Sequence, residues 1–308
     1  MYPKLFGLIA ILLFTSCNSD PDDTGNTLPP ESIVITDDSF TDSTGTSFFL
    51  GSSDCESNGS YFFDNENVYE INFSTDPLPK LFDLSELLPP VGNQLQQGSC
   101  TSWAVTYYLK SFQEHLQSNN PYDNTNLMSP AFSYNQLTMG NCNGTAISAT
   151  LEILKTQGSS ILELMPYNPN ECATQPDEVI KNAAVINKIS EYYYLDNNEL
   201  TRQMKTLITE KQPIIIAAWL TDKFGIKDNF NLTAYRPHNV NFNEQGGCHA
   251  MLVVGYDDNF DAFKVVNSWG TDWGDDGFVW IDYSAFDNTS DPTADFRVIS
   301  EALIATDL

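Results

Sequence analysis

The order of helix-like and strand-like segments is the feature that most restricts the fold of this chain. In residues 100–117 apolar side chains recur at a spacing near 3.6, and Ser99 before them is suited to cap a helix. A second helix is predicted over 146–156, ended by Gly158. The later part of the chain holds short strand-like runs around one further helix (197–211), at residues 184–194, 213–220, 250–256, 263–269, 277–283 and 302–305. A helical half followed by a sheet half predicts an α+β fold with a cleft between two lobes.

Size and charge limit the classes of partner. The 308 residues, 41% of them hydrophobic, suffice for a sizeable core and for one or two domains. The formal net charge of −27 disfavours nucleic acid and anionic lipid headgroups as partners. The sequence holds no glycine-rich phosphate loop and no zinc-ligand spacing, and Asp257, Asp258 and Asp261 fit a turn between strands better than a metal site. We therefore expect no nucleic-acid partner, no metal and no cofactor.

The N-terminus has the features of an export signal. Lys4 precedes an apolar stretch, residues 5–14, that is too short to span a bilayer. The small residues that end in Cys17 resemble a bacterial lipobox, which implies cleavage before Cys17 and diacylation of its thiol. The alternative is an ordinary secretory signal with a chance cysteine. We therefore expect a signal peptide over 1–16 and a protein lipid-anchored in a bacterial cell envelope, at the outer membrane, the cell surface or the periplasmic face.

Composition divides the rest of the chain into three parts. Residues 17–47 are rich in Asp, Ser, Thr, Pro and Gly, which predicts a flexible acidic tether. Residues 48–80 contain several aromatic side chains and are expected to pack on the domain as an N-terminal extension. The main domain is predicted over 81–308.

Separated segments place chemically reactive side chains beside predicted elements. Cys100 lies at the start of a predicted helix, His249 at the start of a predicted strand, and Asn267 at the end of the next strand-like run. Gln94 lies shortly before Cys100, and Trp269 shortly after Asn267. Together they supply a thiol, an imidazole, an amide to orient the imidazole, and a second amide near the thiol. Acyl transfer through a cysteine nucleophile requires this set of groups.

Each of these residues has a specific expected role. The helix start favours the thiolate of Cys100, and a protonated His249 beside it would lower the pKa of the thiol further. His249 would carry the proton between thiol and leaving amine, while Asn267 would fix the imidazole tautomer. Gln94 and the Cys100 backbone N–H would bind the oxyanion, and Trp269 would cover the His249–Asn267 hydrogen bond. Taken singly, each has a structural alternative: a buried cysteine, a structural histidine at a strand start, a turn asparagine, a core aromatic residue or a solvated loop glutamine.

The segments around these residues resemble the motifs of papain-like cysteine peptidases of family C1, from about residue 81 to the C-terminus. Asn93-Gln94 followed by Gly98-Ser99-Cys100 is similar to the nucleophile motif, and His249-Ala250 with Val254-Gly255-Tyr256 to the histidine strand. The asparagine motif is matched by residues 267–274 and Gly277-Phe278. The resemblance implies a helical left lobe and an antiparallel, β-barrel-like right lobe with the active-site cleft between them.

The resemblance also implies an activity and further site residues. The expected reaction is hydrolysis of peptide bonds in a peptide or protein substrate through a Cys-His-Asn triad and a thioester acyl-enzyme, carried out by a monomer. Cys142-Asn143-Gly144 resembles the segment that pairs with substrate, and the expected substrate-binding residues are Gly144, Thr145, Trp269, Ala217, Cys248 and Ala250. Two alternatives remain: a transpeptidase, amide ligase or deamidase with the same thioester chemistry, or a non-catalytic surface binding protein on a peptidase fold.

The chain departs from the family pattern at several positions. Gln97 stands where the family has a disulfide cysteine, Thr101 where it has a tryptophan, and Thr145 at the second glycine of the substrate-pairing segment. Cys248 replaces the aspartate that precedes the histidine in papain. No helical inhibitory pro-segment of the family type is evident between residues 17 and 81.

The six cysteines are then assigned by function. Lipidation takes one and catalysis a second, which leaves Cys55, Cys142, Cys172 and Cys248 in an oxidising compartment. The sequence alone does not fix their pairing. Cys142–Cys172 is the first expectation because both flank one helical segment, and a free Cys248 beside the active site is the alternative.

Overall fold

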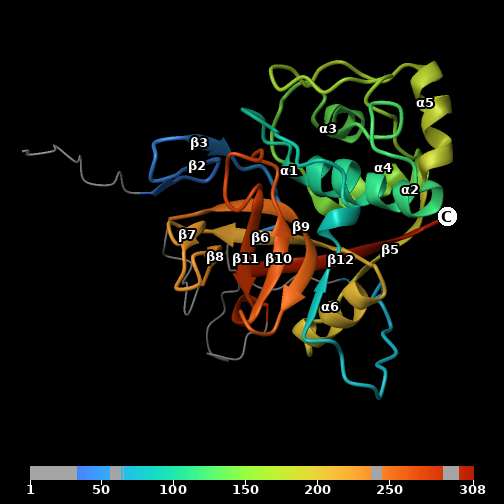
Figure 1. Ribbon diagram of the computed structural model, residues 1–308. Helices are drawn as coiled ribbons and strands as arrows, with labels where there is room; N and C mark the ends of the chain where they lie inside the picture. The colour runs from blue at the N-terminus through green and yellow to red at the C-terminus, as the bar shows by residue number, and fades with distance from the viewer. Residues whose placement is uncertain (1–32, 56–63, 65, 237–244, 287–297) are drawn as a thin grey trace, which may run out of the picture. The chain divides into compact units, whose positions relative to one another are not determined.

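The computed structural model describes residues 33–55, 64, 66–236, 245–286 and 298–308, all within the compact unit Glu31–Leu308 (Figure 1). The predicted signal peptide and Cys17 lie outside the described residues. Among the residues that are described, no helix has both the length and the apolar character needed to cross a membrane.

The helical lobe is built on one continuous helix that begins at Cys100. It consists of α1 (Cys100–Ser102), the π-helical segment η2 (Trp103–Lys110) and α2 (Ser111–Ser118), as the periodicity predicted. Figure 1 shows the other helices of the lobe on the same side of the sheet, namely α3 (Pro130–Thr138), α4 (Ile147–Thr156) and α5 (Glu178–Ala184). Helix α4 ends as predicted, because Gly158 at φ +88° donates to the carbonyls of Ile153 and Leu154.

The second lobe is an open, mostly antiparallel sheet. Its strand order is β5-β12-β6-β9-β10-β11-β8-β7, with β4 also paired to β9. Among the described strands of this sheet, only β8 and β11 run parallel to each other. The described strands are β4 (Leu81–Asp83), β5 (Ile189–Tyr194), β6 (Ile214–Leu220), β7 (Ile226–Lys227), β8 (Thr233–Tyr235), β9 (Gly247–Asp257), β10 (Ala262–Val266), β11 (Phe278–Asp282) and β12 (Ile299–Asp307). The order does not close on itself within the described part of the chain, so the barrel-like lobe is an open sheet.

Short elements complete the sheet lobe. Helix α6 (Leu200–Thr209) covers the lower face of the sheet in Figure 1, where it packs against β4, β6 and β9. Residues 184–188, predicted as part of a strand, form instead the end of α5 and the 3-10 turn η3 (Val185–Asn187). Two further 3-10 turns are η1 (Ser85–Leu87) and η4 (Tyr283–Ala285).

Buried polar contacts join the two lobes. The hydroxyl of Tyr108 in η2 donates to the backbone carbonyl of Asn267 at 2.8 Å. Lys110, also in η2, is fully covered, and it forms ion pairs with Glu114 at 2.8 Å and with Asp307 at the end of β12. A buried lysine without such partners would be strongly destabilising. The ion pair between Lys110 and Asp307 therefore holds the helix against the sheet.

Residues 34–49 form a three-stranded antiparallel meander, where the sequence predicted a flexible tether up to residue 47. Its strands are β1 (Val34–Ile35), β2 (Ser39–Thr41) and β3 (Ser47–Phe49). Two apolar side chains of this segment, Ile35 and Phe40, are buried in the main core. Its polar residues form turns, since Oδ1 of Asp42 accepts from the backbone N–H of Thr44 and Thr46. The tether prediction is therefore wrong for residues 34–47.

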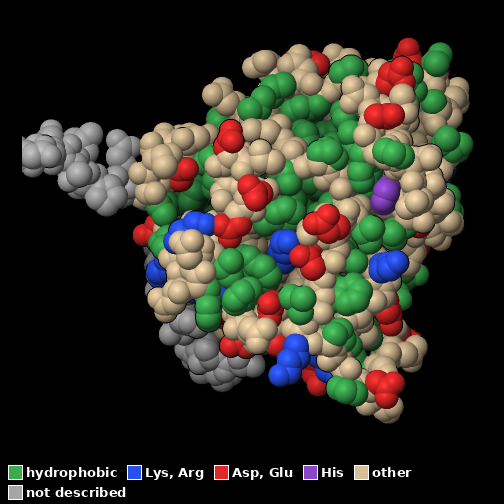
Figure 2. Space-filling model, viewed as in Figure 1, with side chains coloured by type: hydrophobic (Ala, Val, Ile, Leu, Met, Phe, Trp, Pro, Cys, Tyr) green, Lys and Arg blue, Asp and Glu red, His purple; other side chains and the backbone are tan. Residues whose placement is uncertain are grey.

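The described surface agrees with the acidic composition. On the face seen in Figure 2, aspartate and glutamate side chains are scattered over both lobes and do not gather in one patch. Such a surface repels other anions from many directions, as expected for a chain with a formal charge of −27.

Candidate active site

The structure brings His249 and Asn267 into direct contact. His249 lies in β9 and Asn267 directly follows β10, and both side chains are fully buried. Nε2 of His249 lies 2.8 Å from Oδ1 of Asn267, which also accepts the backbone N–H of Ser268 at 2.7 Å. Because a backbone N–H can only donate, this Asn267 atom is an oxygen, and Nε2 of His249 must carry the proton. The lone pair of the neutral ring therefore lies on Nδ1.

Cys100 occupies the first position of α1, as predicted. Its sulfur accepts the backbone N–H of Ala250, the residue after His249, at 3.4 Å. Nδ1 of His249 has no hydrogen-bond partner among the described residues, so the thiol and the imidazole are not hydrogen-bonded in this state. Ser99 precedes the helix but does not cap it with its side chain, because its hydroxyl is bonded to that of Tyr167.

Burial favours the neutral forms of both the Cys100 thiol and the His249 imidazole. It raises the pKa of the Cys100 thiol to about 12 and lowers the pKa of the His249 imidazole to about 4. The sequence predicted a thiolate–imidazolium pair, which needs both charges to be solvated or paired. The difference arises because a segment of the chain itself covers the two groups.

Both the oxygen and the nitrogen of the Gln94 side-chain amide form hydrogen bonds. Its Oε1 accepts the hydroxyl of Ser268 at 2.6 Å. Its Nε2 donates to the backbone carbonyls of Phe49 at 2.9 Å and Gln97 at 2.8 Å. The predicted oxyanion donor therefore already binds a peptide carbonyl in this structure, one that belongs to the same chain.

Trp269 lies against the histidine, as predicted. Its ring centroid is 4.8 Å from that of His249, and only 2% of the residue is exposed. Phe48 stacks on the indole at 4.7 Å and Phe40 at 5.3 Å. The indole is thus enclosed by side chains from the N-terminal meander, which anchors that meander beside the catalytic residues.

We call residues 48–55 the strap, because they cross the predicted cleft in an extended conformation. On one side, the N–H of Thr145 donates to the carbonyl of Gly51 at 2.9 Å, and the N–H of Ser53 donates to the carbonyl of Thr145 at 3.2 Å. On the other side, the N–H groups of Gly51 and Ser52 both point to the carbonyl of Cys248, at 3.3 and 3.2 Å. The strap occupies the place where an extended substrate was expected.

Glycines permit this close approach. A Cβ atom on Gly51 would lie 2.2 Å from the carbonyl oxygen of Gly98, and one on Gly144 would lie 2.7 Å from the carbonyl oxygen of Gly51. Real Cβ atoms do not approach backbone this closely. Gly144, predicted to line the cleft, therefore does contact the segment that fills it.

The other predicted substrate-binding residues lie in adjoining strands. Ala217 in β6 is paired with Ala250 in β9 and, on its other side, with Glu301 in β12. Thr145 and Cys248 both contact the strap through their backbones.

A carboxyl pair between the partly buried Asp54 and the buried Glu301 was not predicted. Asp54 of the strap accepts the hydroxyl of Ser52 at 2.6 Å and the N–H of Ile147 at 3.0 Å, and its carboxyl also contacts that of Glu301. Burial raises the pKa of Asp54, and burial followed by the neighbouring Asp54 charge raises that of Glu301. Glu301, directly before the apolar run 302–305, was the sequence signal for this pair.

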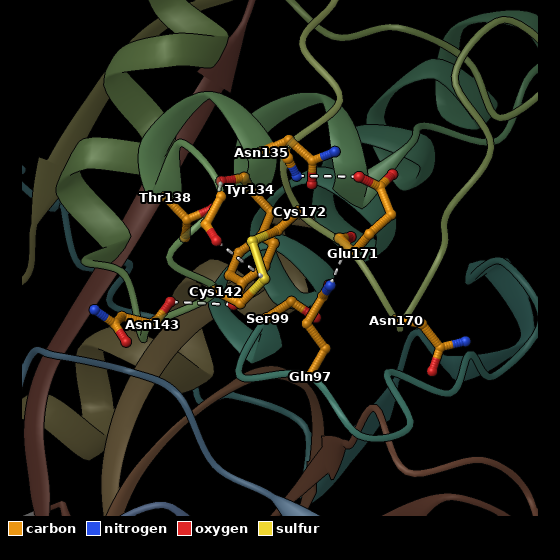
Figure 3. The surroundings of a disulfide bond; sticks show 12 residues. Gln97, Ser99, Tyr134, Asn135, Thr138, Cys142, Asn143, Asn170, Glu171 and Cys172 are labelled. Carbon is orange, nitrogen blue, oxygen red and sulfur yellow. Dashed lines mark hydrogen bonds between the residues drawn. A yellow bond between two sulfur atoms is a disulfide. The ribbon is translucent and has the colours of Figure 1, made fainter.

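The departure from the family pattern at Gln97 is accompanied by a different partner for Cys142. Cys142 pairs with Cys172, as expected, and Figure 3 shows this bond beside Gln97. Gln97, at the place of the family's cysteine, donates to the carbonyls of Asn168 at 3.3 Å and Glu171 at 3.1 Å, the segment before Cys172. The amide of Gln97 thus holds the segment that leads to Cys172, the residue with which Cys142 pairs in this chain.

Cys248 is not free, because it forms a disulfide with Cys55 of the strap. Cys100 is the only free cysteine in the described part of the chain. Within that same part, no group of three or more His, Cys, Asp or Glu side chains is placed to hold a metal ion.

Comparison with known proteins shows which protein family this chain matches. The sequence pattern of the papain family of cysteine proteases matches residues 78–291. The gamete and mating-type specific protein A of Dictyostelium discoideum is 27% identical over 200 residues, which cover 65% of this chain and 41% of that protein. A peptidase C1-like protein of Acanthamoeba polyphaga mimivirus is 25% identical over 261 residues, 78% of this chain and 81% of its own length.

A solved structure has the same fold. Xylellain, a cysteine protease from Xylella fastidiosa, superposes with a TM-score of 0.64 and 21% identity over 82% of this chain and 96% of that chain. This likeness confirms the predicted α+β, papain-like architecture of the two lobes.

Proposed function

The chain belongs to the papain family of cysteine proteases, and on this premise we propose that it is a cysteine-type peptidase that hydrolyses peptide bonds. One observation carries the proposal: the buried His249–Asn267 hydrogen bond adjoins the Ala250 amide that binds the Cys100 sulfur. A nucleophile, a base and an orienting group are thereby collected at one place, supplied by two lobes. A non-catalytic binding protein would have no need of this arrangement.

The proposed reaction begins with the thiol of Cys100. Its sulfur attacks the carbonyl carbon of the scissile peptide bond while its proton passes to Nδ1 of His249, the ring atom that carries the lone pair. The carbonyl oxygen becomes an oxyanion, to which Nε2 of Gln94 and the backbone N–H of Cys100 donate. The C–N bond then breaks, His249 returns the proton to the leaving amine, and a thioester to Cys100 remains.

Hydrolysis of the thioester completes the cycle. A water molecule gives a proton to His249 and attacks the thioester carbonyl. The second tetrahedral species then expels the Cys100 sulfur, which takes the proton back from His249 as the carboxylic acid leaves. Asn267 keeps Nε2 of His249 protonated throughout, so that Nδ1 stays available to both the thiol and the water.

The strap indicates how a substrate would be held. An extended peptide in its place would use the same backbone groups, those of Thr145 on one wall and Cys248 on the other. Ala217 and Ala250, on neighbouring strands, would line the pocket for a side chain of that peptide. Substrate can enter only after the strap has moved, because Cys100 and His249 are fully covered.

The location of the protein is part of this proposal. The export signal and the cysteine at position 17 support a lipid-anchored peptidase of a bacterial cell envelope, acting as a monomer. The test is the change Cys17→Ser, which should move the protein from the membrane fraction to the soluble fraction. Light scattering of the soluble domain should give the mass of one chain.

The activity is tested with a peptide library and reduced, purified protein. We expect the wild type to cleave peptides and Cys100→Ala to lose all cleavage while unfolding at an unchanged temperature. His249→Ala should also be inactive, whereas His115→Ala, a change in α2, should retain full activity. Cleavage by Cys100→Ala equal to that of the wild type would refute the proposal, and amine adducts formed with an added amine would identify transfer instead of hydrolysis.

A further inference from the structure

The disulfide Cys55–Cys248 closes the active site covalently. Cys55 ends the strap, and Cys248 directly precedes His249 in β9. We propose that this disulfide is a redox latch: it keeps the strap in the cleft, and its reduction by a dithiol allows the strap to leave and the peptidase to act. The proposal concerns the regulation of the proposed active site and therefore rests on the proposed function.

The strap is positioned to block the reaction at every step. Its backbone takes the hydrogen bonds of Thr145 and Cys248 that an extended substrate would need. Its Phe49 carbonyl takes the Nε2 donor of Gln94 that an oxyanion would need. Its burial of the thiol leaves Cys100 protonated, since the pKa is raised to about 12. A closed strap is thus incompatible with both substrate binding and thiolate formation.

The disulfide determines what is required to open the site. β4 (Leu81–Asp83) pairs with β9, so the chain joins the sheet lobe at residue 81. Cleavage of the backbone anywhere between Cys55 and Leu81 would break the peptide connection between the strap and the domain. The strap would nevertheless stay covalently linked to Cys248 through the disulfide. Proteolysis at that connection alone therefore cannot release the strap, whereas reduction removes the covalent link.

The chemistry of opening is ordinary thiol–disulfide exchange. Cys55 is partly exposed and Cys248 is only 7% exposed, so the sulfur of Cys55 is the accessible point of attack. A thiolate of the dithiol attacks that sulfur, and Cys248 leaves as a thiolate that takes up a proton. The second thiol of the reductant then attacks the reductant sulfur that is bonded to Cys55 in the mixed disulfide, and the Cys55 thiol is released. The products are two protein thiols and the oxidised, cyclic dithiol.

The second disulfide provides an internal control. Cys142–Cys172 joins the loop after α3 to the segment before α5, within the helical lobe (Figure 3). Neither of its cysteines belongs to the strap. Its loss should therefore not change the requirement for a reductant.

The test measures release of the strap separately from catalysis. The full chain is purified oxidised, treated with or without dithiothreitol, and exposed briefly to iodoacetamide, and labelling at Cys100 is measured by peptide mass spectrometry. Labelling after denaturation confirms that Cys100 is a free thiol in each sample at the start. Hydrolysis of a peptide identified from the library is measured in parallel.

We expect Cys100 of the oxidised wild type to be labelled at least about tenfold more slowly than that of the reduced protein, because a buried thiol reacts only in the open state. The variant Cys55→Ser/Cys248→Ser should be labelled fast without dithiothreitol. The variant Cys142→Ser/Cys172→Ser should still need it. Thermal unfolding of each variant verifies that it is folded.

The outcomes separate the two proposals. Equal labelling of the oxidised and reduced wild type would overturn the latch, whatever the hydrolysis rates are. Fast labelling of the reduced protein without any hydrolysis would sustain the latch and reject the peptidase function. If Cys100 labelling in the Cys142→Ser/Cys172→Ser variant still requires dithiothreitol, the Cys142–Cys172 disulfide is not the bond that responds to reduction. Fast labelling of that variant without dithiothreitol would contradict the proposal.

Discussion

Nε2 of Gln94 donates a hydrogen bond of 2.9 Å to the backbone carbonyl of Phe49, so the predicted oxyanion donor holds a carbonyl of the strap. The amide is oriented by Ser268, whose hydroxyl donates to Oε1 of Gln94 at 2.6 Å. Because Ser268 follows Asn267, one turn of the chain fixes both the amide that orients the histidine and the amide expected to bind the oxyanion. The same donor thus serves the closed state and the proposed transition state.

Replacing Gln94 should impair the chemical step. In Gln94→Ala, the reduced enzyme loses one of two oxyanion donors, so kcat should fall about 10²- to 10³-fold while KM changes little. Steady-state hydrolysis of a library-derived peptide measures this. A variant with wild-type kcat would show that the amide only holds the strap, and Gln97→Ala, which alters an amide directed at Glu171, is the matched control.

Phe48 should hold the strap when the disulfide is absent. It stacks on Trp269 at 4.7 Å, and an aromatic pair contributes about 0.5–1.5 kcal/mol beyond the area it buries. In the Cys55→Ser/Cys248→Ser background, Phe48→Ala should therefore speed the labelling of Cys100 by roughly two- to tenfold. Phe230→Ala, at an exposed ring that contacts Phe260, should leave labelling unchanged. No effect of Phe48→Ala would mean that the backbone contacts alone hold the strap.

The Asp54–Glu301 pair should make the closed state sensitive to pH. Burial raises the pKa of both carboxyls above their ordinary values of 3.8 and 4.5, so the closed state favours their protonated forms. Their contribution to stability is full below the ordinary values and is lost as pH rises through the raised ones. The unfolding temperature of the oxidised protein should therefore fall as the pH rises above these ordinary values.

Asp54→Asn should reduce that dependence, because it removes one titrating group and the repulsion between the two carboxylates. Asp76→Asn, at an exposed carboxyl, is the matched control. Unfolding temperatures across the pH range measure the slope for each protein. Equal slopes for Asp54→Asn and the wild type would show that the pair does not titrate in this range.

The long periodic and alternating segments of the fold were predictable from the sequence. The helix from Cys100 and the strand from 250 were predicted because their apolar residues repeat at the period of each element. The meander at 34–49 was missed because its apolar residues form only short groups, at 33–35, at Phe40 and at 48–50, separated by polar residues. The burial of Phe40 depends on contact with Trp269 and Phe224, which no local pattern reveals.

The candidate site was predicted in its residues but not in its state. Cys100, His249, Asn267 and Gln94 were found because the sequence around each one carries a family motif. The strap carries no motif, since its role depends on backbone hydrogen bonds that any residues can form. The pairing of Cys55 with Cys248 likewise depends on two segments that meet only in the folded chain. The Cys100 thiol is buried in that folded state, and burial raises its pKa and so favours the neutral form.

The coupling between Cys100 and His249 is the centre of the account, and the rate of Cys100 alkylation at pH 6 in the reduced protein tests it most directly. If the released thiol forms an ion pair with the imidazole, the wild type should react about 100-fold faster than His249→Ala, whose thiol should resemble free cysteine. His115→Ala should match the wild type. Equal rates for the wild type and His249→Ala would contradict the proposal that these two residues act together.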